Sequence, residues 1–332
     1  MYWHQVEFNA SPVLFGYYNP PFGYIGLLSC AEFCIVELKE QKMKVFVTGA
    51  SGFVGSAVVK ELLSAGHQVI GLARSEQSAK IVSEAGAEVL MGSLEDLDTL
   101  KQGASEADGV IHAAFSHDFT DYLKASELDK TAINTMCQAM LGTAKPIVVT
   151  AGILGLEPIE GAITEESSTA NSPRLSEATA LALAEKGVHA SVVRFPPSVH
   201  DKGDKGFVPF LIQLARNKGV AAYLEGNIRW SSVHRLDAAR AFRLAVEKSA
   251  KGAVYNVIGD NGIALRDMAL LIGEKLNVPI KSLKDEEIDS HFDWMGRFIR
   301  FDSYATNQKT KELLDWEPTH IGLLEDMEEN YF

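Results

Sequence analysis

Three glycines at three-residue spacing, Gly49, Gly52 and Gly55, follow a β-branched stretch at 44–48 and precede a run with helical apolar spacing. A strand–turn–helix of this kind binds a dinucleotide, because the helix N-terminus offers N–H donors and partial positive charge to the pyrophosphate. We expect the first glycine to permit the tight turn, the second to let main chain approach the pyrophosphate, and the third to let the helix pack closely. The other predicted cofactor contacts of this turn are Ser51, Phe53 and Val54. A merely tight turn between a strand and a helix is the alternative.

The residues after the second predicted strand indicate which nicotinamide cofactor binds. An NAD site places an acidic side chain there, about 20 residues beyond the first glycine, to bind the ribose 2′-hydroxyl. This sequence has Arg74 and Ser75 instead, and no acid between Gly66 and Ser75. A guanidinium and a hydroxyl suit a 2′-phosphate. We therefore predict NADP(H) over NAD(H); the alternative is that Arg74 is a solvated loop cation.

Short β-branched runs alternate with helical patterns from Met43 onward. The predicted strands are 44–48, 68–72, 88–91, 109–113, 146–150 and 190–194, and the predicted helices 56–65, 75–85, 95–103, 133–141 and 176–185. This alternation predicts right-handed βαβ crossovers and an α/β fold with a doubly wound parallel sheet of the Rossmann type.

The rhythm changes after Phe195. Helices are expected at 207–217, 236–248, 265–276 and 306–314, a strand at 254–258, and irregular chain or a short strand at 223–230. We predict a Rossmann core over 43–200 and a smaller mixed α/β substrate lobe over 201–328, with segments around 232–258 returning to the core. Phe207, Phe210, Trp230, Phe292 and Trp294 could line a pocket in this lobe, although such aromatics more often belong to a core. Residues 1–42 are expected to be a non-core extension ahead of a start at Met43.

Several further segments, in order along the chain, carry a family resemblance. They are the glycine turn, Gly92–Asp96 (GSLED), His112–Ala114 (HAA), Val193–Val199 (VRFPPSV), Ser232–Ala239 (SVHRLDAA) and Leu313–Pro318 (LLDWEP). Together they resemble the extended, epimerase/dehydratase-like branch of the short-chain dehydrogenase/reductase superfamily. The resemblance implies cofactor contacts from Ser93, Leu94, Ala113, Ala114, Pro196 and Pro197, and places His200 beside the nicotinamide.

The active-site signature of that superfamily is absent. Its usual chemistry uses a tyrosine acid, a lysine four residues later that lowers the tyrosine pKa, and a serine or threonine that binds the substrate oxygen. None of the nine tyrosines has a lysine four positions on, and the expected stretch, 168–174, contains neither residue. This departure resembles the atypical subgroups of the superfamily. Gly152 stands where the substrate-binding serine would be expected.

Three residues could replace the lost groups. Thr150, at the end of the fifth strand, could donate a hydrogen bond to a substrate oxygen. His117, after the fourth strand, could shuttle a proton near neutral pH. Arg174 could hold the nicotinamide ribose or polarise a carbonyl. The alternatives are a surface histidine for His117 and, for Arg174, a helix-end cation paired with Glu177.

Two functions remain open on this sequence. The first is an NADP(H)-dependent oxidoreductase that reduces a C=O, C=C or C=N bond of a small organic molecule. The second is a catalytically silent NADP(H)-binding redox sensor. The missing tyrosine–lysine pair favours the sensor, whereas the full-length substrate lobe favours the enzyme.

Charge and composition limit the partners. The formal net charge is −13 and no cluster of five basic residues occurs, so nucleic acid and membrane surfaces are not expected partners. The three cysteines have neither a disulfide pattern nor metal-ligand spacing, which predicts no metal site and a reducing, cytoplasmic compartment. The resemblance implies a homodimer through helices near 131–141 and 176–185.

Overall fold

A seven-stranded parallel sheet forms the centre of the computed structural model, which describes residues 42–116, 121–169 and 172–332. Its order is β3 (Glu88–Met91), β2 (Gln68–Ala73), β1 (Lys44–Thr48), β4 (Gly109–His112), β5 (Pro146–Gly152), β6 (His189–Phe195) and β10 (Val254–Asn256). The central strands are buried, as their continuous apolar runs require in a sheet covered on both faces. The order reverses between β1 and β4, and such a switch point is where ligands bind in open α/β sheets. The predicted Rossmann fold is confirmed.

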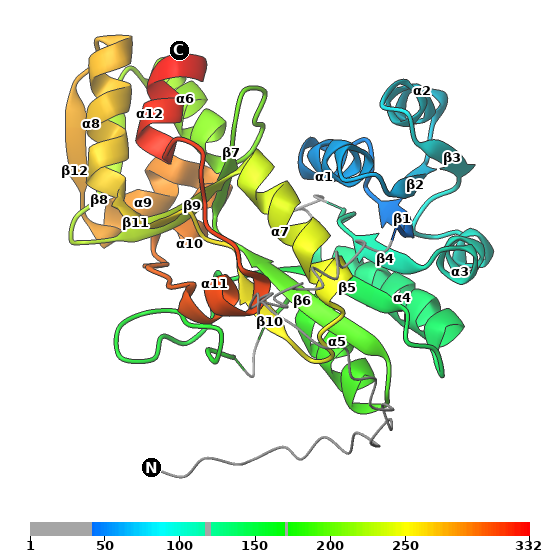
Figure 1. Cartoon of the computed structure of the whole chain (residues 1–332). Coiled ribbons are helices and arrows are strands. Elements are labelled where there is room, and N and C mark those ends of the chain that lie inside the picture. Colours follow the sequence, from blue (N-terminus) through cyan, green and yellow to red (C-terminus); the bar gives the residue numbers. More distant parts are fainter. Residues whose placement is uncertain (1–41, 117–120, 170–171) are drawn as a thin grey trace, which may run out of the picture. The chain divides into compact units, whose positions relative to one another are not determined.

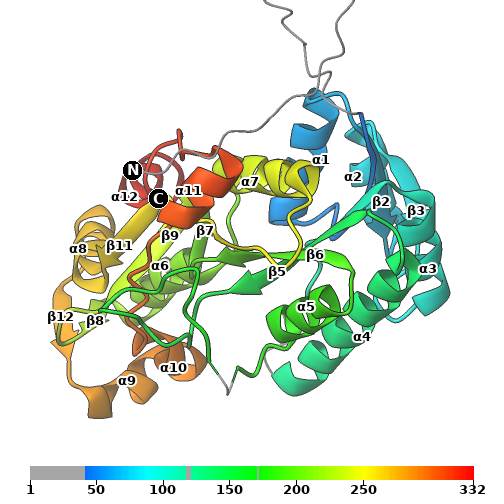
Figure 2. The ribbon, with the colours of Figure 1, turned by 60° about the horizontal axis from the view of Figure 1, so that its bottom comes forward.

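Helices cover both faces of this sheet (Figure 2). One face packs against α1 (Phe53–Ser64), α2 (Glu76–Glu84), α7 (Arg235–Lys248) and α11 (Gln308–Leu314). The other packs against α3 (Leu97–Glu106), α4 (Tyr122–Met140) and α5 (Ser176–Glu185). The helices α4 and α5 contact each other, and a homodimer through them stays a prediction.

The remaining elements form a smaller α/β lobe at the end of the sheet near β6 (Figure 1). It holds a three-stranded sheet of β7 (Ser198–His200), β9 (Arg229–His234) and β11 (Asp260–Ala264), and a pair of β8 (Ala221–Leu224) and β12 (Ile280–Leu283). Its helices are α6 (Phe207–Lys218), α8 (Leu265–Leu276), α9 (Asp285–Phe292), α10 (Gly296–Ile299) and α12 (Leu323–Asn330), with a 3₁₀ turn at Asp293–Met295. A separate apolar core, which includes Trp230 and Phe292, holds the lobe together.

His200 connects the three-stranded sheet of the lobe to the C-terminal helix α12. Its Nδ1 lies 2.8 Å from a carboxylate oxygen of Asp326, and both side chains are buried. The His200 ring also meets the ring of His234 edge-on, with centroids 5.4 Å apart. The expectation that His200 borders the nicotinamide is therefore wrong, because the side chain is enclosed by protein.

Element boundaries differ from prediction in two places. The helix expected at 133–141 begins at Tyr122. Its first turns bury polar residues such as Ser126 and Asp129, so the local sequence lacks a clear apolar stripe there, and contacts with α3 and α5 bury this face. The segment 223–230, expected to be irregular chain or one short strand, contains the end of β8 and the start of β9. Residues 1–41, which contain all but one residue of the predicted extension, lie outside the described residues.

Candidate cofactor and active site

The glycine turn has the geometry that its spacing predicts. Gly49 has φ +71°, and a Cβ there would lie 2.8 Å from the Ala114 nitrogen. A Cβ on Gly55 would lie 2.0 Å from the Gly49 carbonyl oxygen, so only glycine permits α1 to pack this closely. A Cβ on Gly52, by contrast, would meet only that same oxygen, at 3.1 Å. Gly49 and Gly55 thus shape the turn, while Gly52 keeps its outer side open.

The first turn of α1 can hold a pyrophosphate. No side chain caps this helix, whose N-cap is Gly52. The amides of Phe53 and Val54 precede the first intrahelical bond, from the Ser56 amide to the Gly52 carbonyl. Sequence reasoning missed Arg235, whose guanidinium lies 4.6 Å from the ring centroid of Phe53 and pairs with Asp201 at 2.7 Å. The open glycine, the uncapped amides and a nearby cation fit a dinucleotide.

The predicted adenine-side residues lie together at the ends of β2 and β3. The Gly92 amide donates to the Ala73 carbonyl, which brings the turn with Ser93 and Leu94 next to Arg74. The Ser75 hydroxyl caps α2 by accepting from the Ser78 amide at 3.2 Å. Arg74 itself is exposed and makes no hydrogen bond or ion pair within residues 42–116, 121–169 and 172–332. Its guanidinium is available to a ligand.

The predicted residues of the nicotinamide side follow neighbouring strands. The Ala113 amide donates to the Thr48 carbonyl and the Ala114 amide to the Thr48 hydroxyl, which holds this segment against the glycine turn. Pro196 and Pro197 follow β6, whose Phe195 pairs with Gly152 of β5. All of them therefore stand at the carboxyl edge of the sheet.

A buried polar chain extends from the glycine turn beneath this edge. The Thr48 hydroxyl lies 2.8 Å from Nδ1 of His112, whose Nε2 lies 2.9 Å from Asp129. The Ser176 hydroxyl donates to the second oxygen of Asp129. Burial alone would raise the pKa of Asp129, but the hydrogen bond and charge of His112, the charge of Arg174 and the Ser176 hydrogen bond lower it below its usual value. The carboxylate is thus kept ionised inside the protein.

Arg174 lies at the end of this series of hydrogen-bonded side chains. Its Nε donates to the Ser176 hydroxyl at 3.0 Å and its Nη2 to the Thr150 carbonyl at 3.1 Å. The guanidinium carbon also lies 4.3 Å from the ring centroid of Phe115. The alternative pairing with Glu177 is wrong, because Glu177 binds Arg194 through both oxygens at 2.6 Å. The structure therefore brings Arg174 to the ends of β4 and β5.

Thr150 stands at this same edge, with its hydroxyl already engaged. Its Oγ1 donates to the His112 carbonyl at 2.8 Å. The proton that we expected it to offer a substrate is therefore used within the sheet, and only lone pairs of the oxygen remain. His117, the other predicted proton-transfer residue, lies outside the described residues.

Tyr122 is the residue here that sequence reasoning missed. It begins α4, and its ring centroid lies 5.7 Å from that of Phe115, the ring that Arg174 covers. Burial raises the pKa of Tyr122, and the charge of Arg174 opposes that rise. The tyrosine was passed over because it has no lysine four residues on; the cation comes from a distant segment instead, which no local spacing could signal.

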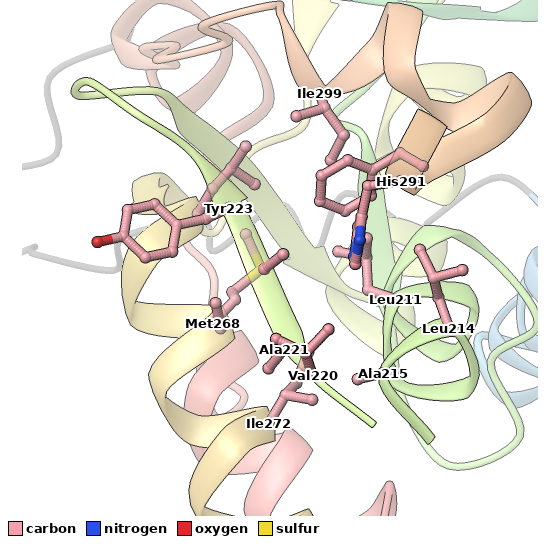
Figure 3. A pocket seen from close by; sticks show the side chains of 14 residues that line it. Leu211, Leu214, Ala215, Val220, Ala221, Tyr223, Met268, Ile272, His291 and Ile299 are labelled. Atoms are coloured by element: carbon pink, nitrogen blue, oxygen red, sulfur yellow. The ribbon is translucent and has the colours of Figure 1, made fainter. Parts of the chain in front are cut away.

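The lobe itself contains no room for a substrate in its apolar core. A cavity lies between α6, β8, α8 and α9, where Figure 3 shows His291 and Ile299 across from Met268 and Ile272. Its volume is about 10 Å³, which is the space of a single water molecule. This cavity is therefore too small to hold a substrate.

Neither a metal centre nor a membrane-spanning helix occurs in the described ranges. Within them, no three His, Cys, Asp or Glu side chains are grouped so that they could hold a metal ion. In the same part of the chain, no helix has the length and apolar character needed to cross a bilayer.

The fold and the glycine turn together define an α/β protein that binds a nicotinamide dinucleotide. Comparison with known proteins agrees. Residues 49–206 match the NAD(P)H-binding family. The solved structure of DesIV, a dTDP-glucose 4,6-dehydratase of Streptomyces venezuelae, is similar with a TM-score of 0.69 at 19% identity, over 87% of this chain and 98% of that one. At this identity the likeness is one of fold.

Two curated proteins are similar in sequence. The uncharacterized protein YLL056C of Saccharomyces cerevisiae is 45% identical over 295 residues, covering 87% of this chain and 99% of that protein. A 4-hydroxy-2-methyl-3-oxo-4-farnesyl-3,4-dihydroquinoline-1-oxide ketoreductase of Stigmatella aurantiaca is 29% identical over 243 residues, covering 70% of this chain and 73% of that protein. The identity with YLL056C over nearly the whole of both proteins shows that the chain belongs to the same family, and the match of residues 49–206 shows that it has an NAD(P)H-binding domain. Its fold is that of epimerase/dehydratase-like enzymes, which agrees with the resemblance of its motifs.

Proposed function

We propose that this protein is an NADP(H)-dependent reductase of a carbonyl group in a small organic molecule. The observation that carries the proposal is the position of Arg174, a cation fixed by Ser176 and by the Thr150 carbonyl at the carboxyl edge of the sheet. A fixed cation at that edge can stabilise the negative charge that develops on a carbonyl oxygen as it is reduced. The relative from Stigmatella aurantiaca, named as a ketoreductase, supports the same reaction class.

The cofactor preference rests on Arg74. This exposed guanidinium follows β2 directly, and Ser75 and Ser78 hold the start of α2 beside it. A 2′-phosphate there would receive charge-assisted hydrogen bonds, and no acid lies between Gly66 and Ser75 to take the place of that phosphate. The pyrophosphate would be held by the turn from Gly49 to Gly55. NADPH, when bound, supplies the hydride.

The proton must come from a group of this chain or from water. Tyr122 is the phenol placed to donate it, because its ring lies against Phe115, the ring that Arg174 covers. Burial raises the pKa of Tyr122 and weakens it as an acid, whereas the charge of Arg174 opposes that rise. The charge of Arg174 would stabilise the phenolate that remains after donation. The carbonyl oxygen receives this proton while its carbon receives the hydride, so that an alcohol and oxidised cofactor are formed. His117 stays a second candidate from the sequence.

The test is NADPH consumption by the purified protein with a panel of ketones and aldehydes, together with calorimetry of NADPH and NADH binding. We expect turnover with NADPH, and loss of that turnover in Tyr122→Phe with NADPH binding retained. Tight NADPH binding with no turnover on the whole panel would overturn the reductase and favour the redox sensor. Absence of binding by either reduced cofactor would overturn both functions.

A further inference from the structure

A cluster of aromatic rings extends from the core of the lobe to its surface. Trp230 is fully buried at its base, and Phe207 contacts it with ring centroids 5.5 Å apart. Phe207 also contacts Phe298 at 5.0 Å, and Phe210 contacts Trp294 at 5.0 Å. The Trp294 side chain is 41% exposed although it belongs to this cluster. The cluster thus carries aromatic surface from the buried core of the lobe out to solvent, where the apolar part of a ligand could cover it.

This aromatic cluster lies toward the carboxyl edge of the core sheet, where Arg174 and Tyr122 are found. The guanidinium of Arg297 lies 4.5 Å from the ring centroid of Phe298. Burial raises the pKa of Tyr122, and Arg297 is, after Arg174, the second cation whose charge opposes that rise. Figure 2 agrees, since α10 lies on the side of the sheet that α4 and α5 cover. The rings of Phe115 and Tyr122 add aromatic surface from the core.

Two arginines of the lobe, Arg229 and Arg300, are poorly placed to bind a diphosphate. Arg229 is held by Asp302 through two hydrogen bonds of 3.1 and 2.6 Å and lies over the ring of Tyr304. Arg300 binds Asp285 and Asp289, each at 2.6 Å. Guanidinium groups already neutralised by carboxylates contribute little to a doubly charged ligand. This local pairing disfavours the nucleotide sugars that are named with several of the structural neighbours.

We infer that the aromatic cluster of Phe207, Phe210, Trp294 and Phe298 binds the apolar body of the substrate, which is a ketone carrying a long alkyl, isoprenoid or aromatic group. Arg174 then faces the carbonyl end. This inference rests on the proposed reduction for the identity of the reacting group, but the binding surface exists independently of it. The ketone named with the Stigmatella aurantiaca relative carries a farnesyl chain, which agrees with such a class.

The experiment uses ligands that differ only in apolar length. Turnover is measured with methyl ketones from 2-butanone to 2-undecanone, and binding with the N-methyl amides of the same chain lengths in the presence of NADP+, because amides are not reduced. Each methylene that the cluster buries should tighten amide binding about threefold. The variants are Trp294→Ala and, as the control, Phe301→Ala, since Phe301 is 42% exposed in the same lobe but makes none of these ring contacts.

We expect kcat/KM and amide affinity to rise with chain length in the wild type and in Phe301→Ala, and to rise much less in Trp294→Ala. Amide binding that follows this pattern without any ketone turnover would refute the proposed reduction and leave the binding surface established. Turnover that is independent of chain length, or equal effects of the two substitutions, would overturn the inference and leave the reductase standing. Tighter binding of UDP-glucose than of the longest amide would also overturn it.

Discussion

The guanidinium of Arg174 lies 4.3 Å from the ring centre of Phe115, so a cation from the segment before α5 covers a ring from the loop after β4. In the usual active site of this superfamily, a lysine supplies the charge beside a tyrosine from the same helix. Here the charge and Tyr122, which contacts the same ring, come from separate segments. The functional pairing can therefore persist although the sequence motif is lost.

Arg174 supplies the first prediction. Arg174→Ala removes the charge beside the carbonyl oxygen, and we expect kcat to fall about 100-fold or more, as it does when one oxyanion-stabilising donor is deleted. Arg174→Lys retains charge but cannot bind both Ser176 and the Thr150 carbonyl, so its activity should be intermediate. Steady-state kinetics with NADPH checks this, and the Kd of NADPH serves as the control because it should change little. Equal activity of Arg174→Ala and wild type would remove Arg174 from the reaction.

The glycine turn gives a matched pair of substitutions. Gly55→Ala places a methyl group 2.0 Å from a main-chain oxygen, so the fold should lose about 2–3 kcal/mol of stability. Gly52→Ala meets only one atom, at 3.1 Å, and should fold normally while its methyl group blocks the pyrophosphate. Thermal unfolding and NADPH calorimetry separate the two effects. A Gly52→Ala protein that binds NADPH as tightly as wild type would contradict this placement of the cofactor.

Local patterns predicted the sheet and the turn because each depends on neighbouring residues. The apolar runs of β1 and β5 and the three-residue spacing of Gly49, Gly52 and Gly55 are complete within short windows of sequence. The three-residue strand β7 was missed, because so short a strand is defined by its pairing with β9 rather than by its own composition.

The contacts at the carboxyl edge of the sheet were less predictable, because they join segments that are far apart in the sequence. Arg174 was recognised as a candidate, and pairing with Glu177 by helical spacing was the alternative to a role in the site. The carboxylate of Glu177 instead meets the buried Arg194, whose remaining donors bind main-chain carbonyls of the loop after β5. A buried guanidinium competes strongly for a carboxylate, and only the folded chain reveals that competition.

Arg74 tests the cofactor preference directly. We expect wild type to bind NADPH at least ten times more tightly than NADH, since a guanidinium on a 2′-phosphate forms charge-assisted hydrogen bonds. Arg74→Ala should lose most of that ratio by weakening NADPH binding and leaving NADH binding almost unchanged. Calorimetry with both cofactors measures the ratio, and Lys80→Ala is a control of equal charge change on exposed α2. A ratio near one in wild type would refute the NADP(H) assignment.

The buried Asp129 and the half-buried Asp204 predict opposite responses of stability to pH. The pKa of Asp129 is lowered in the folded protein, so its contribution is complete above the ordinary value near 4 and is lost as the pH falls through the lower folded value. Asp129→Asn breaks the contact with His112 at neutral pH and should cost about 3 kcal/mol, with a smaller loss at the acidic end.

For Asp204 the sign reverses, because burial raises its pKa despite hydrogen bonds from the Gly206 amide and the Tyr331 hydroxyl. Its ionised form destabilises the fold as the pH rises through that higher value. Asp204→Asn should therefore equal or exceed the stability of wild type at pH 7, since the amide oxygen still accepts from Gly206 while the buried charge is gone. Urea unfolding between about pH 2 and pH 8 compares the two variants, because the contribution of Asp129 changes only below its ordinary pKa near 4. Destabilisation of both by the same amount at every pH would show that lost packing, and not charge, determines their stability.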